Sequence, residues 1–284
     1  MNVVGLVVHE GRAAAVAAAA ELERALVADG ERVVAAREGP SAQGFDLVVS
    51  VGGDGTFLRG AHVAAEADCP VLGVKVGRLG FLTEVEPPEA LALIRQALTG
   101  VADIEERIAA IARSAGGATF DAQWGLNEIM VEKRARHRLV RLAVEVDGTY
   151  VTTFSADGVV VATPTGSTAY SFSARGPIVS PDVPCLVLTP VAAHMVFDRS
   201  FVLGADQRVV LEVVGDEPGL LSADGRESVE LPVGSRALIA AAERSARLVR
   251  RPDAAGFLSR VRDKFELPGD PSTGDTDGDV GIRD

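Results

Sequence analysis

The chain has 284 residues, of which 47% are hydrophobic and 24% charged, a composition typical of a globular protein with a substantial core. Its length favours two domains over one. The formal net charge of −12 argues against a nucleic-acid-binding protein, which needs a basic surface to neutralise phosphates.

The first hundred residues alternate short apolar runs with helical patterns. Continuous apolar runs are typical of strands that are covered on both faces, and strands separated by helices predict a parallel sheet. We therefore expect a Rossmann-like α/β domain over residues 1–101. The expected strands are 3–8, 32–36, 46–51 and 70–76, with an alanine-rich helix after the first strand and a second helix over 56–67.

After Gly100 the pattern changes to short strands with glycine and proline between them. Only the stretch after Gly166 offers a helix. This organisation predicts an all-β sandwich domain over residues 102–252. The strand candidates are 106–112, 126–132, 139–146, 150–154, 158–162, 185–188, 208–214 and 237–241.

The C-terminal part contains one further helical pattern and a polar tail. Phe257, Val261 and Phe265 recur every four residues, which predicts an amphipathic helix within 253–267. Residues 268–284 are rich in Gly, Asp, Ser and Thr without periodicity, and we expect a disordered acidic tail there.

The motif Gly52-Gly53-Asp54-Gly55-Thr56 lies between an expected strand and an expected helix. Glycines at such a turn let backbone N–H groups close around a phosphate, and the helix N-terminus adds its positive dipole end. A carboxylate at this place is unfavourable unless Asp54 performs chemistry, holds Mg²⁺ or accepts a hydroxyl proton. The dinucleotide fingerprint fails at Leu58, and the chain has no Gly-Lys pair for a P-loop. By itself, the motif is equally typical of a tight structural turn.

A second motif follows the expected strand 158–162 and reads Thr-Pro-Thr-Gly-Ser-Thr-Ala-Tyr over 163–170. It carries five hydroxyl side chains, more than one helix cap requires, although Ser167 or Thr168 could simply be such a cap. A serine hydrolase is disfavoured because no Gly-x-Ser-x-Gly elbow is present. A short-chain dehydrogenase is disfavoured because Ala174, not lysine, follows Tyr170 by four residues.

With this motif the sequence resembles the NAD kinase family over roughly residues 2–267. Four blocks carry the resemblance in the family's order: 52–56, 79–82 (Leu-Gly-Phe-Leu), 126–128 (Leu-Asn-Glu), and 157–170 continuing through Gly176-Pro177. Phosphofructokinases and lipid kinases share similar glycine turns, so the specific signal is the block 157–170 after an Asn-Glu pair.

The resemblance implies an α/β domain, a β-sandwich and a final helix that packs back on the first domain. NAD would lie between the domains and receive a phosphoryl group on its adenosine ribose 2′-hydroxyl from ATP or polyphosphate. Asp54 would be the general base or would organise the hydroxyl with Mg²⁺. The metal would be carried with the nucleotide and not by a protein-only ligand set, and His9, His62, His137 and His194 show no metal-binding spacing.

The family pattern also implies binding residues. Gly53, Gly55 and Thr56 would receive phosphates. Asn127 and Glu128 would hold the ribose and adenine of NAD. Without the other blocks, Asn127 and Glu128 would be interpreted as an exposed polar pair at the end of a strand. Asp157 would contact the second nucleoside. The further residues assigned to NAD are Thr165, Thr168, Ala169 and Tyr170, which would line the adenine pocket, together with Ser173. Phe81 and Asp224 are additional candidates.

Two residues depart from the family pattern. Lys75 stands in Lys-Val-Gly where the family has Asn-Leu-Gly, and it either contacts a phosphate or reaches into solvent. Arg175 replaces the first glycine of a Gly-Gly-Pro turn, and it either reshapes the loop or forms an ion pair across a subunit interface.

Two other functions remain as alternatives: a lipid or sugar kinase that shares the glycine turn, and a non-catalytic NAD(P)-binding regulator. The resemblance further implies a homodimer or homotetramer. The N-terminus does not resemble a signal peptide and no apolar run reaches the ~18 residues of a membrane span, so we expect a cytoplasmic protein that binds neither membranes nor nucleic acid.

Overall fold

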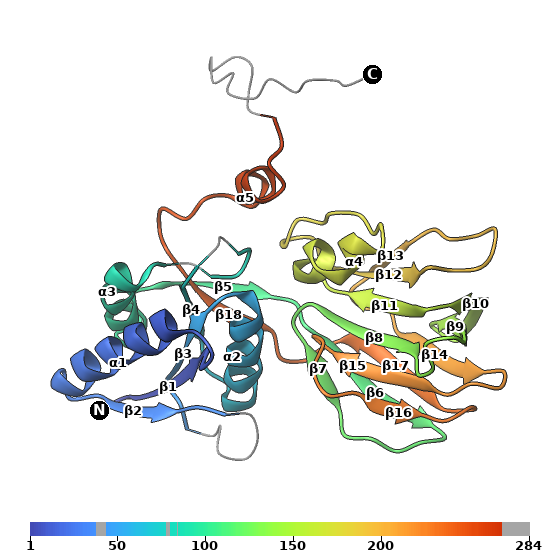
Figure 1. Cartoon of the computed structure of the whole chain (residues 1–284), viewed down its shortest axis with the longest axis horizontal. Helices are drawn as coiled ribbons and strands as arrows, with labels where there is room; N and C mark the ends of the chain where they lie inside the picture. Colours follow the sequence, from blue (N-terminus) through green and yellow to red (C-terminus); the bar gives the residue numbers. More distant parts are fainter. Residues whose placement is uncertain (38–43, 78–79, 84, 269–284) are drawn as a thin grey trace.

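The computed structural model describes residues 1–37, 44–77, 80–83 and 85–268, which form an α/β domain and a β-sandwich (Figure 1). The predicted fold class is confirmed, including a final helix. Leu79 and the tail from residue 269 onward lie outside the described residues. None of the described helices combines the length and the apolar character needed to cross a membrane.

The first sheet is parallel except at one edge, where β5 runs antiparallel to β18. In spatial order its strands are β2 (Arg32–Ala35), β1 (Val3–Val8), β3 (Leu47–Gly52), β4 (Val71–Lys75), β18 (Ala246–Arg250) and β5 (Asp103–Arg107). Strand β2 pairs with one edge of β1, and β3 pairs with the opposite edge of β1. The carboxyl ends of β1 and β3 therefore flank a topological switch point, where ligands bind in open α/β sheets.

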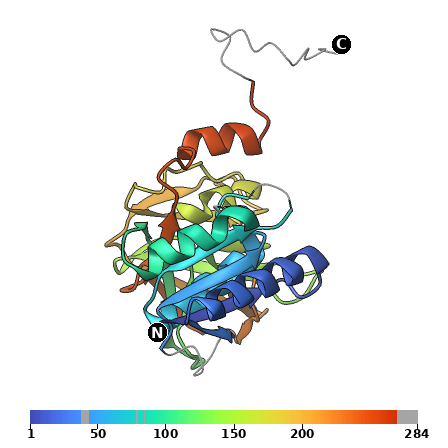
Figure 2. The ribbon, with the colours of Figure 1, turned by 90° about the vertical axis from the view of Figure 1, so that its left-hand side faces the viewer.

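Helices cover both faces of this sheet (Figure 2). Helices α1 (Ala13–Ala28) and α3 (Pro87–Leu98) pack on one face, and α2 (Asp54–Ala67) packs on the other. Side chains of β3 alternate between the two cores, with Val49 on the α1 side and Val48 on the α2 side. This double coverage explains why the strands read as continuous apolar runs.

Strands β5 and β18 correct the expected domain limits. Both lie within the range 102–252, which we expected to form the sandwich, yet both pair in the first sheet. The expected strand 106–112 is in fact two strands in different sheets, because the chain crosses between the domains after Arg107. It resumes as β6 at Ala110. The sequence pattern also did not predict α3.

The second domain consists of two antiparallel sheets around a core that includes Leu142, Phe154 and Leu188. In spatial order, one sheet contains β10 (Thr149–Ala156), β9 (Val140–Val146), β14 (Val209–Val214), β17 (Arg236–Ala241), β6 (Ala110–Gly116) and β7 (Gln123–Gly125). The other contains β13 (Phe201–Gly204), β12 (Cys185–Val191), β11 (Gly158–Ala162), β8 (Glu128–Lys133), β15 (Gly219–Ala223) and β16 (Val229–Leu231).

Short helical segments lie on the outer face of the second sheet and at the end of the described chain. The 3-10 turn η2 (Thr165–Thr168) and helix α4 (Tyr170–Ser173) follow β11, and α5 (Phe257–Lys264) follows β18. Figure 1 shows α5 above both domains, not on the first alone. Just beyond α5, the ring of Phe265 packs against Phe81 of the α/β domain and Phe172 of α4, at centroid distances of 5.9 and 4.5 Å.

The two domains share an apolar core at their junction. Phe57 and Ala61 of α2 belong to the same buried cluster as Trp124 of β7 and the adjacent Leu126. Arg226 adds polar contacts there, with Nη2 donating to the carbonyl of Trp124 at 2.6 Å. This junction fixes the glycine turn, which begins α2, relative to the sandwich.

Candidate active site

The glycine turn lies at the carboxyl end of β3, where α2 begins. Gly53 is the N-cap of α2 and no side chain caps the helix, so the N–H groups of Asp54 and Gly55 remain available to an anion, whereas the N–H of Thr56 donates to the carbonyl of Gly53 at 2.9 Å. A Cβ atom on Gly53 or Gly55 would meet nothing within 4 Å, whereas one on Gly52 would lie 2.5 Å from Thr56 Oγ1. Thr56 is buried and supports the turn from inside. The open side of the turn is formed by Gly53 and Gly55.

Asp54 is held by the backbone of Phe81 and Leu82. Its Oδ2 accepts the N–H of Phe81 at 2.9 Å, and its Oδ1 accepts the N–H of Leu82 at 3.2 Å. Gly80 permits this approach, because a Cβ atom there would overlap the Asp54 carboxylate. The two amides fix the orientation of the carboxylate and leave each oxygen with a lone pair for a hydroxyl or a metal ion.

Asn127 and Glu128 lie at the start of β8, around the carboxylate of Asp224. That carboxylate accepts the N–H of Leu126 and of Asn127 at 2.8 Å, and the N–H of Glu128 at 3.1 Å. Asp224 adopts a left-handed backbone with φ of 51°, which a non-glycine residue rarely does. Within its own chain, Asp224 therefore shapes the turn that presents the Asn-Glu pair.

Glu128 is buried, and its Oε2 has no hydrogen-bond partner in the described part of the chain. Burial, and secondly the charge of Asp224, raise the pKa of Glu128 to about 8. Burial also raises the pKa of Asp224, but its three amide donors make Asp224 the member that carries the negative charge. A buried carboxyl oxygen without a partner costs free energy that a ligand hydroxyl would recover.

The hydroxyl motif after β11 folds over the same turn. Thr163 Oγ1 donates to the carbonyl of Leu126 at 2.6 Å and accepts the N–H of Gly166 at 3.2 Å. Gly166 is required, because a Cβ atom there would overlap the carbonyl of Asn127. The N–H of Thr163 also donates to the carbonyl of Asn127 at 2.8 Å. The two family blocks at 126–128 and 157–170 thus form one hydrogen-bonded unit.

The remaining predicted residues divide into buried and exposed groups. Thr165 is buried, Thr168 and Ala169 are half-buried, and Tyr170 and Ser173 are exposed beside them. Asp157 forms an ion pair with Lys133 at 2.5 Å between Oδ1 and Nζ. Lys75 forms an ion pair with Glu86 at 3.0 Å, a partner that the sequence did not indicate.

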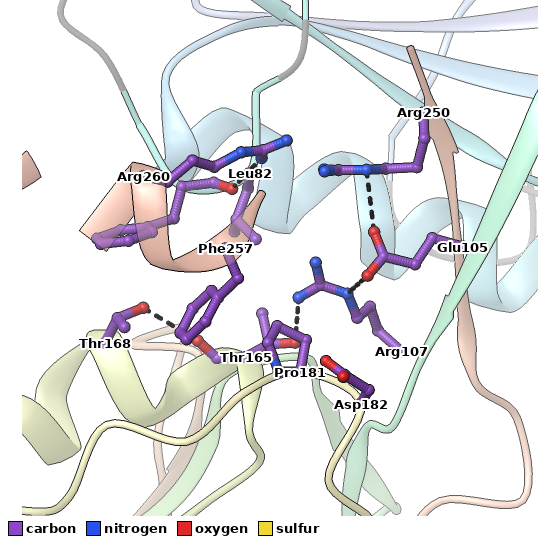
Figure 3. Close-up of a pocket in the computed structure, with 11 residues that line it drawn as sticks. Leu82, Glu105, Arg107, Thr165, Thr168, Pro181, Asp182, Arg250, Phe257 and Arg260 are labelled. Atoms are coloured by element: carbon purple, nitrogen blue, oxygen red, sulfur yellow. Dashed lines mark hydrogen bonds and ion pairs between the residues drawn. The ribbon is translucent and has the colours of Figure 1, made fainter. Parts of the chain in front are cut away.

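A pocket of about 160 Å³ brings the two halves of the site together (Figure 3). Phe81 and Leu82, which hold Asp54, line one side, and Thr165 and Thr168 of the hydroxyl motif line the other. Phe81 thus lies next to both halves of the site. Among the described residues, no group of three or more His, Cys, Asp and Glu side chains could hold a metal ion.

Sequence reasoning missed Arg107 and Arg260 at this pocket. Arg107 is buried, with Nη1 donating to Thr165 Oγ1 at 3.2 Å. Arg260 of α5 donates from Nη1 to the carbonyl of Phe81 at 3.1 Å. An arginine at a strand end and one on a basic helix look solvent-exposed in sequence, so only the fold reveals these contacts.

The chain matches two family models in succession. The description "ATP-NAD kinase N-terminal domain" applies to residues 38–102, and "ATP-NAD kinase C-terminal domain" to residues 126–251. Among curated relatives, the NAD kinase of Rhodococcus erythropolis is 41% identical over 244 residues, which are 85% of this chain and 77% of the relative. The NAD kinase of Leifsonia xyli subsp. xyli is 38% identical and covers 93% of this chain and 94% of the relative.

Solved structures agree on the fold. Yeast NADH kinase in complex with NADH superposes with a TM-score of 0.83 over 95% of this chain and 89% of its own, at 23% identity. An NAD kinase from Archaeoglobus fulgidus in complex with ATP superposes with a TM-score of 0.73 over 93% of this chain and 96% of its own, at 26% identity. The arrangement of an α/β domain and a sandwich is therefore common to all three chains.

Proposed function

This chain belongs to the NAD kinase family, whose reaction is the phosphorylation of NAD to NADP, and from that premise we propose how its residues share the reaction. Asp54 faces the adenosine ribose of NAD and accepts the proton of the 2′-hydroxyl. The ribose oxygen then bonds to the terminal phosphorus of the donor, and the bond from that phosphorus to the leaving phosphate chain breaks. The observation that carries this assignment is the Asp54 carboxylate, fixed by the amides of Phe81 and Leu82 beside an open glycine turn.

The phosphates of the donor lie against the amides of Gly53 and Gly55, with Thr56 supporting the turn. ATP or polyphosphate can serve as donor, because a turn of backbone amides recognises phosphate groups and not the base. Phosphoryl transfer requires mainly positioning and charge stabilisation, which suits amides and one carboxylate. A divalent metal bound to the donor would neutralise phosphate charge, and the lone pairs of Asp54 would be available to contact it.

NAD occupies the pocket formed by the two blocks of the sandwich. The unpartnered Oε2 of Glu128 accepts a ribose hydroxyl, and Asn127 contacts the adenine. Asp157 contacts the second nucleoside. The residues that we assign to the adenine pocket and its rim are Thr165, Thr168, Ala169, Tyr170 and Ser173. The placement of Phe81 and Thr165 around one pocket supports this arrangement.

We also propose that the enzyme assembles as a homodimer or homotetramer in the cytoplasm. Exposed apolar residues at the edges of the sandwich support an interface between subunits, and they include Tyr150, Val151 and Val202. The free cysteines Cys69 and Cys185 fit a reducing compartment. Light scattering coupled to size-exclusion chromatography would measure the mass of the assembly.

One assay tests the reaction. The purified protein is incubated with NAD, Mg²⁺ and either ATP or polyphosphate, and NADP is detected with an NADP-specific dehydrogenase. We expect NADP from the wild type, and a loss of about 10²–10⁴-fold in kcat for Asp54→Asn, typical of a lost general base. No NADP with either donor would reject the kinase function. An Asp54→Asn variant as active as the wild type would reject only the role of Asp54.

A further inference from the structure

Helix α2 begins with Asp54 and lies on the side of the α/β domain that faces the sandwich (Figure 1). His62 lies about two turns further along this helix, about 12 Å from Asp54 at 1.5 Å per residue. Nε2 of His62 lies 2.8 Å from Nη1 of Arg226, a residue of the sandwich. The proposed reaction gives neither His62 nor Arg226 a role.

Arg226 closes a tight turn that also contains Asp224. The N–H of Arg226 donates back across the turn at 3.0 Å, and φ is positive at both central residues, 51° at Asp224 and 65° at Gly225. Asp and Gly adopt this conformation more readily than most residues do. Asp224 accepts the amides of residues 126–128, whereas Arg226 reaches α2. One short turn therefore contacts both the Asn-Glu pair and the helix that begins with Asp54.

The side chain of Arg226 also contacts a strand of the sandwich. Its Nη2 donates to the carbonyl of Trp124 in β7 at 2.6 Å, and the ring of Trp124 lies 5.7 Å from the ring of His62. The apolar packing between α2 and Trp124 is non-directional, whereas hydrogen bonds fix both distance and angle. Arg226 therefore fixes how α2 lies against the sandwich, and with it the distance from Asp54 to the pair that holds the ribose.

The hydrogen bond between Arg226 and His62 requires a neutral imidazole. A guanidinium group only donates, so Nε2 of His62 accepts, and a protonated ring would place two cations in contact. Glu66 of the same helix has its Oε1 3.5 Å from Nε2 of His62, and a protonated His62 would donate to it. The other charged groups at this junction are Asp224 and Arg244, which donates to a carbonyl near the end of α2 at 3.2 Å. Protonation would therefore exchange a bond between the domains for one within the helix.

We propose that Arg226 and His62 are positioning residues that hold Asp54 at its working distance from the ribose of NAD while His62 is neutral, an inference that rests on the proposed function of Asp54. In this arrangement neither residue contacts a substrate, and both act through α2 and the turn at Asp224. When His62 binds a proton, the hydrogen bond to Arg226 is lost. Asp54 and the Asn-Glu pair are then no longer held at a fixed distance.

Steady-state kinetics with saturating NAD and donor test the effect on Asp54. Arg226→Met removes both hydrogen bonds and keeps most of the length of the side chain. We expect kcat to fall about tenfold, since a displacement of about 1 Å can cost about 10²-fold, while both KM values stay within about threefold because no substrate contact is lost. Arg138→Met is the matched control, because Arg138 is 70% exposed and forms a surface ion pair with Glu217 at 3.5 Å. Thermal melting verifies that each variant is folded at the assay temperature.

The pH dependence of kcat separates positioning from general stabilisation. His62→Gln keeps an acceptor at the position of Nε2 and cannot bind a proton, so its kcat should fall less on acidification than that of the wild type. His62→Leu removes the acceptor and should lower kcat at every pH. His137→Gln is the control, because His137 is exposed, and it should follow the wild-type profile.

Trp124 reports on this hydrogen bond without a measurement of activity. It is the only tryptophan of the chain, and a protonated imidazole next to an indole quenches its fluorescence. We expect the wild-type emission to fall over the pH range in which kcat falls, and His62→Gln to show no such step. In Arg226→Met the step should move to higher pH, because a cation no longer opposes protonation of His62.

The positioning role is overturned if folded Arg226→Met retains the wild-type kcat, or if His62→Gln loses kcat over the same pH range as the wild type. An emission step at the same pH in Arg226→Met and in the wild type overturns the hydrogen bond itself. A wild type that forms no NADP with either donor rejects the proposed function and the catalytic part of the inference. The emission of Trp124 then decides separately whether Arg226 and His62 are bonded.

Discussion

Phe81 donates its backbone N–H to the carboxylate of Asp54 at 2.9 Å. The same residue accepts a hydrogen bond from Arg260 through its carbonyl, and its ring packs against Phe265. One residue thus connects the proposed general base with the segment that ends the described chain. The orientation of Asp54 therefore depends on residues near the C-terminal end of the described chain, which hold Phe81 in place.

Gly80→Ala should displace the Asp54 carboxylate, because the added methyl group would overlap it. We expect kcat to fall at least tenfold, since misplacing a catalytic group by about 1 Å can cost about 10²-fold. Stability should fall by about 1–3 kcal/mol, the usual cost of overpacking. Steady-state kinetics and urea unfolding would measure both. Gly256→Ala is the control, because a Cβ atom there meets nothing within 4 Å. An unchanged kcat in Gly80→Ala would contradict the role of residues 80–82 in orienting Asp54.

Phe265→Leu should weaken the packing of both halves of the active site, the segment at Phe81 and helix α4 at Phe172. The ring of Phe265 stacks on Phe172 at 4.5 Å and an interplanar angle of 29°, and it contacts Phe81 at 5.9 Å. Each aromatic pair contributes about 0.5–1.5 kcal/mol beyond its buried area, so a double-mutant cycle with Phe172→Leu should show a coupling of that size. We expect a lower kcat, whereas Leu258→Ala on the preceding helix α5, where Leu258 is 76% exposed, should leave kcat unchanged. Purely additive effects of the two Phe substitutions would argue against the coupling.

Glu128→Gln should change how stability depends on pH. In the folded protein the pKa of Glu128 is raised to about 8 from its ordinary value of 4.5, so between these values unfolding releases its proton. The wild type therefore loses stability as pH rises through this window, with a slope of up to about 1.4 kcal/mol per pH unit. The variant lacks this proton, and its profile should be flatter. The midpoints of urea unfolding, measured from pH 5 to 9, would show the difference. Glu227→Gln is the control, because Glu227 is exposed. Parallel pH profiles for both variants and the wild type would count against the raised pKa of Glu128.

Arg175→Gly should raise stability slightly. Arg175 has φ of 67°, a left-handed conformation that costs a non-glycine residue about 1–2 kcal/mol, while glycine loses about 0.5–1 kcal/mol of chain entropy. We therefore expect a net gain of about 0–1.5 kcal/mol. Ala174→Gly is the matched control, because φ is −86° at Ala174 and the substitution there should destabilise. A loss of stability in Arg175→Gly would mean that the arginine side chain makes contacts worth more than the strain.

Local patterns predicted much of this structure. The apolar run before Gly52 and the helical pattern after Thr56 correctly placed the glycine turn between β3 and α2. The short alternating strands predicted the sandwich. Arg175 stands where the family commonly has glycine, and its backbone adopts a left-handed conformation that glycine favours.

Contacts between distant residues could not be predicted. Asp224 lies 97 residues from Asn127 in sequence, yet its carboxylate shapes that turn. Strand β5 reads Asp-Ile-Glu-Glu-Arg, a charged sequence typical of the edge of a sheet, and β18 is recognisable as its partner only in the folded chain. In both cases the stabilising partner comes from another part of the chain, so no local window contains the signal.

The place of β18 between β4 and β5 has a consequence for synthesis on the ribosome. Leu248 pairs with Val71, so the first sheet keeps an open edge at β4 until nearly the whole chain has been translated. The strands of the sandwich all lie between β5 and β18, and they can complete their two sheets earlier. The domain that begins the chain is therefore the last to be finished. A fragment that ends at Ser245 would contain every strand of the sandwich but only an incomplete α/β sheet.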